Sequence, residues 1–82
     1  MNLYLIWVKE DDVDRYDTFD SAVVCAENID EARHIHPTGD QNRWADRWWC
    51  WVDNPDKVYV KLIGKADATI EKGVVLASFN AA

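Results

Sequence analysis

The sequence predicts a small α+β domain: an antiparallel sheet of four or five strands with one short helix packed on one face. Short apolar stretches rich in Val, Ile and aromatic residues recur along the chain, and a single capping signature marks one helix. The length of 82 residues suits one domain. We therefore expect residues 1–82 to form a single domain with a Trp-rich loop at about 38–51.

Two strands are predicted in the N-terminal third of the chain. Leu3–Val8 is an apolar stretch typical of a strand, and the acidic residues that follow it predict an exposed turn. The second strand is Thr18–Ala26, whose centre is apolar on both faces. This pattern is typical of a central strand that a helix covers on one side.

The predicted helix begins at a capping box, in which Asn28 is followed three residues later by Glu31. It is expected to run from about residue 29 to residue 34 or 35, because Pro37 disfavours the helical conformation in the residue before it. Glu31 and His34 are expected to face water, and the inward-facing residues are expected to be Ala32 and Ile35.

The second half of the chain predicts a loop and then further strands. The loop covers Pro37–Arg47, and a strand at about Trp49–Val52 is favoured over a helical turn because its tryptophans alternate. Asp53–Asp56 predicts a turn, Val58–Leu62 alternates as a half-buried strand, and Val74–Phe79 predicts the last strand.

Tryptophan is concentrated in one stretch of the chain. Of the five tryptophans, four are Trp44, Trp48, Trp49 and Trp51. One face of one element cannot bury so many indoles, and Trp is enriched at interfaces and ligand platforms. The cluster therefore indicates a binding protein, and the sequence leaves open whether it lines a pocket, a subunit interface or the core.

Charge and composition exclude several classes of protein. Nine acidic residues stand against two basic ones between Lys9 and Glu31, and the net charge is -6. This distribution lacks the basic field that binding of free nucleic acid requires. No signal peptide and no membrane span are predicted, so we expect a cytoplasmic protein with Cys25 and Cys50 as reduced thiols.

Catalytic and metal sites are disfavoured by the sequence. His34 and His36, with Cys50, do not have the spacing of a metal site, since residues two apart on a helix point in different directions. Ser21 lacks the glycine-flanked turn of a nucleophilic serine. We therefore expect no catalytic residue, no metal and no cofactor.

One set of residues is suited to a small anionic ligand. Arginine binds phosphate with paired donors, indole stacks on bases, and Ser or Asn reads polar edges. The alternative is that Arg33 and Arg47 pair with carboxylates and Trp48 and Trp51 fill the core. In this alternative Ser78 and Asn80 merely end a strand. The candidate ligand-binding residues are Arg33, His36, Arg43, Trp44, Arg47, Trp48, Ser78 and Asn80.

Three segments carry a resemblance to known proteins: LYLIW at the N-terminus, DTFDSAVVCAENIDEARHIHP and GVVLASFNA. Together they resemble a group of small, mostly uncharacterised proteins of tailed bacteriophages. The resemblance implies a viral counter-defence factor that acts by binding in the cytoplasm of the host cell.

Two functional hypotheses follow. The first is a non-enzymatic binding protein that sequesters a small anionic nucleotide-like signal. The second is an acidic inhibitor that mimics nucleic acid and occupies a host nuclease or immune effector. A homo-oligomer is also expected, and it gives a third possibility, in which subunit contacts bury the excess tryptophan surface and explain the aromatics without any ligand.

Overall fold

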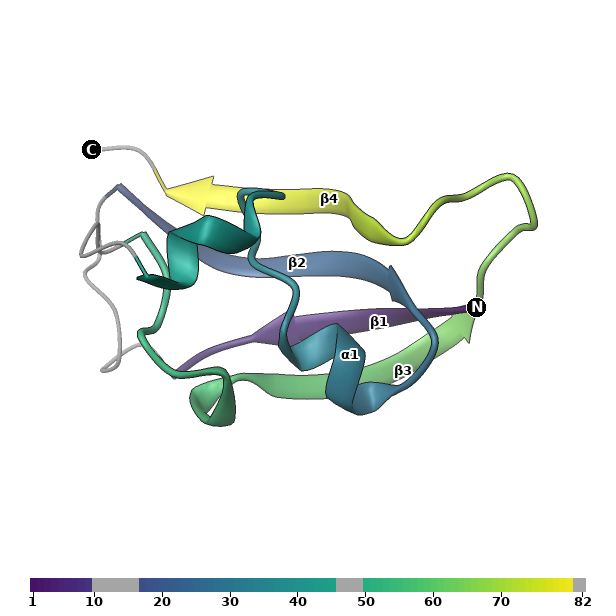
Figure 1. Ribbon diagram of the computed structural model, residues 1–82, viewed down its shortest axis with the longest axis horizontal. Helices are drawn as coiled ribbons and strands as arrows, with labels where there is room; N and C mark the ends of the chain where they lie inside the picture. The colour runs from purple at the N-terminus through teal and green to yellow at the C-terminus, as the bar shows by residue number, and fades with distance from the viewer. Residues whose placement is uncertain (10–16, 46–49, 81–82) are drawn as a thin grey trace.

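The computed structural model describes residues 1–9, 17–45 and 50–80 of the chain (Figure 1). The strands are β1 (Asn2–Trp7), β2 (Thr18–Ala26), β3 (Tyr59–Lys65) and β4 (Gly73–Asn80), and they form one antiparallel sheet in the order β3-β1-β2-β4. The helices are the α-helix α1 (Ile29–Arg33) and the short 3-10 helices η2 (Gln41–Ala45) and η3 (Pro55–Lys57). This architecture confirms the predicted α+β class.

The inner strands β1 and β2 are antiparallel neighbours along their whole paired length, from Asn2 opposite Ala26 to Trp7 opposite Ser21. The position of β2 confirms that Thr18–Ala26 is a central strand. The remaining strands are the two edges of the sheet, β3 beside β1 and β4 beside β2. Residues brought by β3 and by β4 therefore lie at opposite sides of the molecule.

Helix α1 begins at the predicted capping box. The side-chain oxygen of Asn28 accepts a hydrogen bond from the backbone N–H of Glu31 at 2.8 Å. In return, a Glu31 carboxylate oxygen accepts from the backbone N–H of Glu27 at 3.0 Å, one residue before the usual donor. The first bond satisfies a backbone donor that the helix start would otherwise leave free, and the second fixes the chain just before the N-cap.

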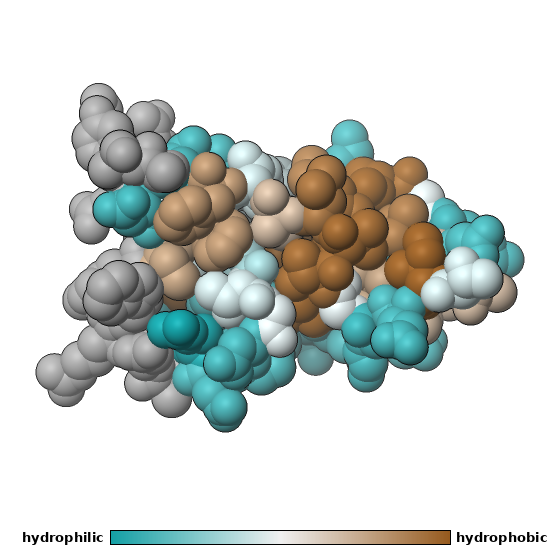
Figure 2. All heavy atoms as spheres, turned by 90° about the horizontal axis from the view of Figure 1, so that it is seen from above, coloured by the Kyte–Doolittle hydropathy of each residue, from teal (hydrophilic) through white to brown (hydrophobic). Residues whose placement is uncertain are grey.

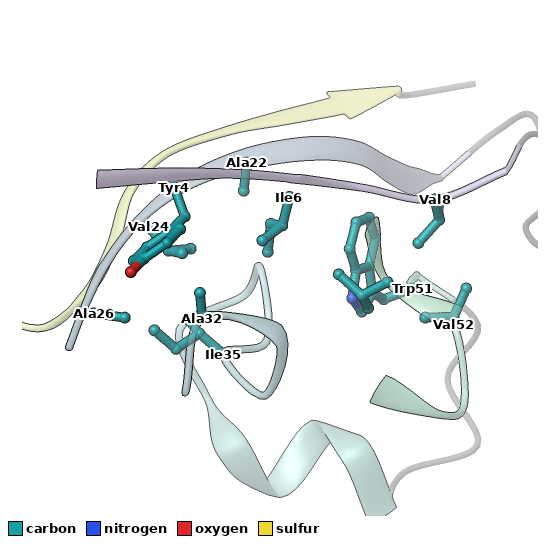
Figure 3. Close-up of a cluster of buried hydrophobic side chains, with 11 residues drawn as sticks. Tyr4, Ile6, Val8, Ala22, Val24, Ala26, Ala32, Ile35, Trp51 and Val52 are labelled. Carbon is teal, nitrogen blue, oxygen red and sulfur yellow. The ribbon is translucent and has the colours of Figure 1, made fainter. Parts of the chain in front are cut away.

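The core lies between the sheet and α1 (Figure 3). Tyr4 and Ile6 of β1 and Val24 of β2 point toward the buried face of α1. The buried residues there are Ala32 of α1 and Ile35, which lies two residues after the helix ends, and they confirm the predicted inward pair. Beyond the helix, Val8, Trp51, Val52 and Val58 extend the core.

The strand predicted at Trp49–Val52 is wrong for the part that the structure describes, since residues 50–52 have no strand conformation. Trp51 and Val52 are consecutive, yet each is only 4% exposed. A half-buried strand alternates its side chains and would not bury both, so the alternation of tryptophans was a misleading signal. Instead, the carbonyl of Cys50 accepts a hydrogen bond from the N–H of Phe19, 2.8 Å away, at the start of β2.

The opposite face of the sheet, called here the open face, is covered by none of the described helices (Figure 3). Leu5, Val23 and Leu76 occupy neighbouring positions across β1, β2 and β4 on this face. Paired residues of adjacent strands point to the same side, and Leu5 alternates with the buried Tyr4 and Ile6. The sheet therefore has a packed face and a partly apolar open face.

Candidate anion-binding site

A pocket of about 380 Å³ lies at the β3 edge of the sheet. Three segments distant in the sequence build it: the residues after β1, the end of α1, and η3 with the start of β3. Ligand pockets in proteins are typically about 300–1,000 Å³, so this one suits a small molecule. Its lining residues are Lys9, Arg33, Asp56, Lys57, Val58, Tyr59 and Val60.

Arg33 is held at the wall of this pocket by the helix itself. It is the last residue of α1 and follows Ala32, which is fully buried against the sheet. Its Nε atom is buried and has no hydrogen-bond partner among the described residues. A buried donor without an acceptor costs about 1–3 kcal/mol, so an acceptor that reached this atom would relieve that cost.

The pocket is locally positive in an acidic protein. Lys9, Arg33 and Lys57 supply three cations, against the carboxylate of Asp56. Neither Lys9 nor Arg33 forms an ion pair with a described residue, whereas the Lys57 ammonium lies 3.0 Å from an Asp53 carboxylate oxygen. Its hydrogen bond to Asp53 and its charge lower the pKa of that exposed carboxyl.

A second group of predicted residues meets in the loop after α1. His36 is only 2% exposed, and its ring packs edge-on against Trp44 with 5.1 Å between the centroids. The indole N–H of Trp44 donates to the carbonyl of His34 at 2.9 Å. These contacts give His36 and Trp44 a structural role, because they order the loop after α1.

The hydrogen bonds of His36 define its protonation. Its Nδ1 accepts from the backbone N–H of Thr38 at 3.2 Å, which places the proton of the neutral ring on Nε2. Burial lowers the pKa of His36, the charge of Arg43 lowers it further, and Asp40 partly offsets both. His36 is therefore a neutral side chain at pH 7 and supplies no positive charge to an anion.

The remaining predicted residues lie elsewhere. Ser78 of β4 is opposite Ser21, which places it on the open face, and Asn80 is opposite Thr18 at the end of the same strand. The sheet thus separates Ser78 from Arg33, His36 and Trp44. Arg47 and Trp48 lie outside the described residues.

Sequence reasoning missed Lys9 and Lys57 as partners of Arg33. Lys9 stands directly before a run of acidic residues, and Lys57 follows Asp56, so their local sequence indicates solvated charge. Only the antiparallel pairing of β1 with β3 brings the two lysines to one edge.

A larger hollow of about 620 Å³ lies on the packed face between α1 and the start of β4. Ile35 and Val74 line it together with polar residues. The Lys72 ammonium at its rim lies 3.2 Å from a Glu31 carboxylate oxygen, and the two charges compensate each other. Asp30 adds a second carboxylate to the lining, so this hollow lacks the positive balance of the pocket at the β3 edge.

No family model, curated protein or solved structure matches this chain. Within residues 1–9, 17–45 and 50–80, no helix is long and apolar enough to cross a membrane. The same residues contain no group of three or more His, Cys, Asp or Glu side chains arranged to hold a metal ion.

Proposed function

We propose that this chain is a non-enzymatic binding protein that captures a small anionic, nucleotide-like ligand through its phosphate groups. The observation that carries the proposal is the buried Nε of Arg33 without an acceptor at the wall of a pocket that also presents Lys9 and Lys57. Arginine and lysine together are the side chains that proteins use to bind phosphate oxygens. A counter-defence role, in which the ligand is a host signal, is the biological context of this proposal.

The pocket supports phosphate recognition more than base stacking. Among the described residues that line it, Tyr59 is the aromatic one, and its ring stacks on Trp7 with 5.5 Å between centroids. Trp7 lies opposite Ser21 and Tyr59 in the register, so this stack belongs to the open face. The anionic end of the ligand is therefore the part that the pocket is proposed to hold.

The test is calorimetric titration of the protein with pyrophosphate and with a panel of linear and cyclic nucleotides. We expect Arg33→Ala to weaken binding at least tenfold, because one charge-assisted hydrogen bond contributes about 1.5–3 kcal/mol. Arg33→Lys keeps the charge but loses the paired donors, and should bind with intermediate affinity.

The matched control is Lys61→Ala. Lys61 lies on β3, is exposed, and is opposite Leu5 on the open face. The Lys61→Ala substitution removes one positive charge from β3, the strand that contributes to the pocket, but Lys61 does not line the pocket. Ligand affinity should therefore stay near that of the wild type. Equal losses in Arg33→Ala and Lys61→Ala, or no binding of any anion by the wild type, would contradict the proposal.

The mimicry hypothesis makes a different prediction. Its central residues, Asp11, Asp12 and Asp14, lie outside the described residues. Changing all three to Asn should leave anion binding intact if the pocket is the functional site. If these changes abolish inhibition of a host nuclease or effector while Arg33→Ala does not, the protein acts through its acidic surface instead.

A further inference from the structure

The two edges of the sheet differ in how they are protected from pairing with another chain. Edge strands expose unpaired N–H and C=O groups, and proteins usually protect them with charged side chains, above all lysine. The β3 edge carries Lys61 and Lys65, whereas β4 has the sequence GVVLASFN and no ionisable side chain over 8 residues. Only β3 therefore has this protection.

The β4 edge is also the site of strongly exposed apolar side chains. Leu76 is 70% exposed, Phe79 48% and Val75 45%, and Leu76 has the highest value among the large hydrophobic residues that the structure describes. Figure 2, viewed from above onto the β4 side of Figure 1, shows a hydrophobic surface there. Contact of these apolar side chains with water is unfavourable, and their burial would stabilise a complex.

The geometry of β4 leaves a regular stretch for pairing. Val75 is an extra residue in the ladder, since Val23 is opposite Leu76 and Val24 is opposite Val74. From Leu76 to Asn80 each β4 residue has its own partner on β2. This stretch of β4 has no second strand beyond it within the described residues.

We propose that a second copy of this chain pairs its β4 antiparallel to this one, so that two sheets join across a twofold axis. In a twofold interface the same surface is used by both subunits, so an uncharged apolar edge meets an identical one. All three pairs of neighbouring strands in the sheet are antiparallel, so an antiparallel pair of β4 strands would continue the same pattern. Leu76 of each copy would then be shielded at the seam.

For a second copy, the distribution of charge favours contact at the β4 edge over contact at the rest of the surface. Each copy has a net charge of -6, so two copies repel each other over most of their surface. The stretch Gly73–Asn80 contributes nothing to that charge. The anion pocket is at the opposite edge, beside β3, and pairing through β4 leaves it accessible in both copies.

The test is sedimentation equilibrium over a wide range of protein concentration. The wild type should approach twice its 9.5 kDa mass, and Leu76→Lys should remain monomeric. The matched control is Leu62→Lys on the other edge, where Leu62 is 54% exposed, and it should dimerise like the wild type. A wild type that is monomeric throughout, or a loss of dimer in Leu62→Lys equal to that in Leu76→Lys, would overturn the proposal.

A crosslinking measurement keeps the proposal testable if Leu76→Lys does not fold. Ser78→Cys places an exposed thiol on β4, while the native Cys25 and Cys50 are both buried. A short bismaleimide should join two Ser78→Cys chains efficiently and two Lys61→Cys chains poorly. Equal crosslinking of the two variants would contradict pairing through β4. Capture of a foreign apolar peptide by a monomeric wild type would show that the edge has another occupant.

Discussion

At the scale of single residues, Arg33 and His36 have different surroundings in the structure, although the sequence predicts both as ligand-binding residues. Arg33 keeps a buried donor without a described acceptor beside two lysines. His36 has its ring nitrogen hydrogen-bonded within its own loop and its edge against Trp44. The first arrangement favours a ligand, and the second stabilises the loop.

The lowered pKa of His36 predicts a specific pH dependence of stability. Because the unfolded chain binds a proton near pH 6.5 and the folded chain binds it only at lower pH, stability is present above 6.5 and falls as the pH drops below it. The free energy of unfolding, measured by urea denaturation across this range, should decrease toward acid. His36→Asn, which retains an acceptor near the Nδ1 position, should remove that decrease.

The matched control for this prediction is the exposed His34. His34→Asn should leave the acid decrease unchanged. Hydrogen bonds lower the pKa of Glu31 from its ordinary value of 4.5 and the pKa of Asp53 and of Asp67 from 3.8. The stability that these carboxyls contribute is therefore lost only at more acidic pH than the decrease caused by His36. An acid decrease that persists in His36→Asn would show that another group is responsible.

At the scale of secondary-structure elements, the sequence predicted the features that depend on residues close to one another in the chain. The capping box and the central position of Thr18–Ala26 are confirmed, because each depends on neighbours in sequence or on a long apolar stretch. The helix ends before Pro37 as expected, but at Arg33 and not at residue 34 or 35. The strand at Trp49–Val52 failed because Trp51 packs into the core from irregular backbone. Such packing depends on tertiary contacts, which alternation of residue types does not specify.

The cap of α1 gives a prediction that joins stability to binding. Asn28→Ala should cost about 1 kcal/mol of unfolding free energy, because it removes the acceptor for the Glu31 N–H. A less ordered α1 should also weaken anion binding, since Arg33 is the last residue of that helix. Urea denaturation and calorimetric titration of the same variant check both effects.

Asn42→Ala is the matched control, because Asn42 is also an exposed asparagine but lies in η2. It should change stability by less than about 0.5 kcal/mol, as is usual for surface substitutions. If Asn28→Ala has no larger effect than Asn42→Ala, the capping box does not stabilise the helix as inferred.

At the scale of the whole molecule, the order of the strands places the proposed ligand pocket and the proposed dimer interface at opposite edges of the sheet. The pocket lies beside β3, and the uncharged apolar surface lies along β4. The candidate site could not be assembled from the sequence, because Lys9, Arg33 and Lys57 come from three separate segments. Their proximity follows from strand order and register, which pattern analysis of one chain does not supply.

Ligand binding at the β3 edge should stabilise the whole domain. At a hundredfold excess of free ligand over its Kd, the folded state gains about 2.7 kcal/mol relative to the unfolded state. Thermal unfolding of the wild type should therefore shift to higher temperature with a saturating anion, and that of Arg33→Ala should not. Sodium chloride at equal ionic strength is the control for general screening. A shift of the same size in Arg33→Ala would place binding elsewhere.

The most direct test of the proposed function follows the Nε–H of Arg33 itself. In a ¹H–¹⁵N spectrum, pyrophosphate or a nucleotide that binds should shift the Arg33 Nε–H resonance saturably as this donor gains an acceptor. The other arginines, Arg15, Arg43 and Arg47, serve as internal references, and Arg33→Lys identifies the signal by removing it. A saturable shift confined to Arg33 is the result that we expect. Saturable binding that leaves the Arg33 signal in place, or an absence of binding, would contradict the proposed site.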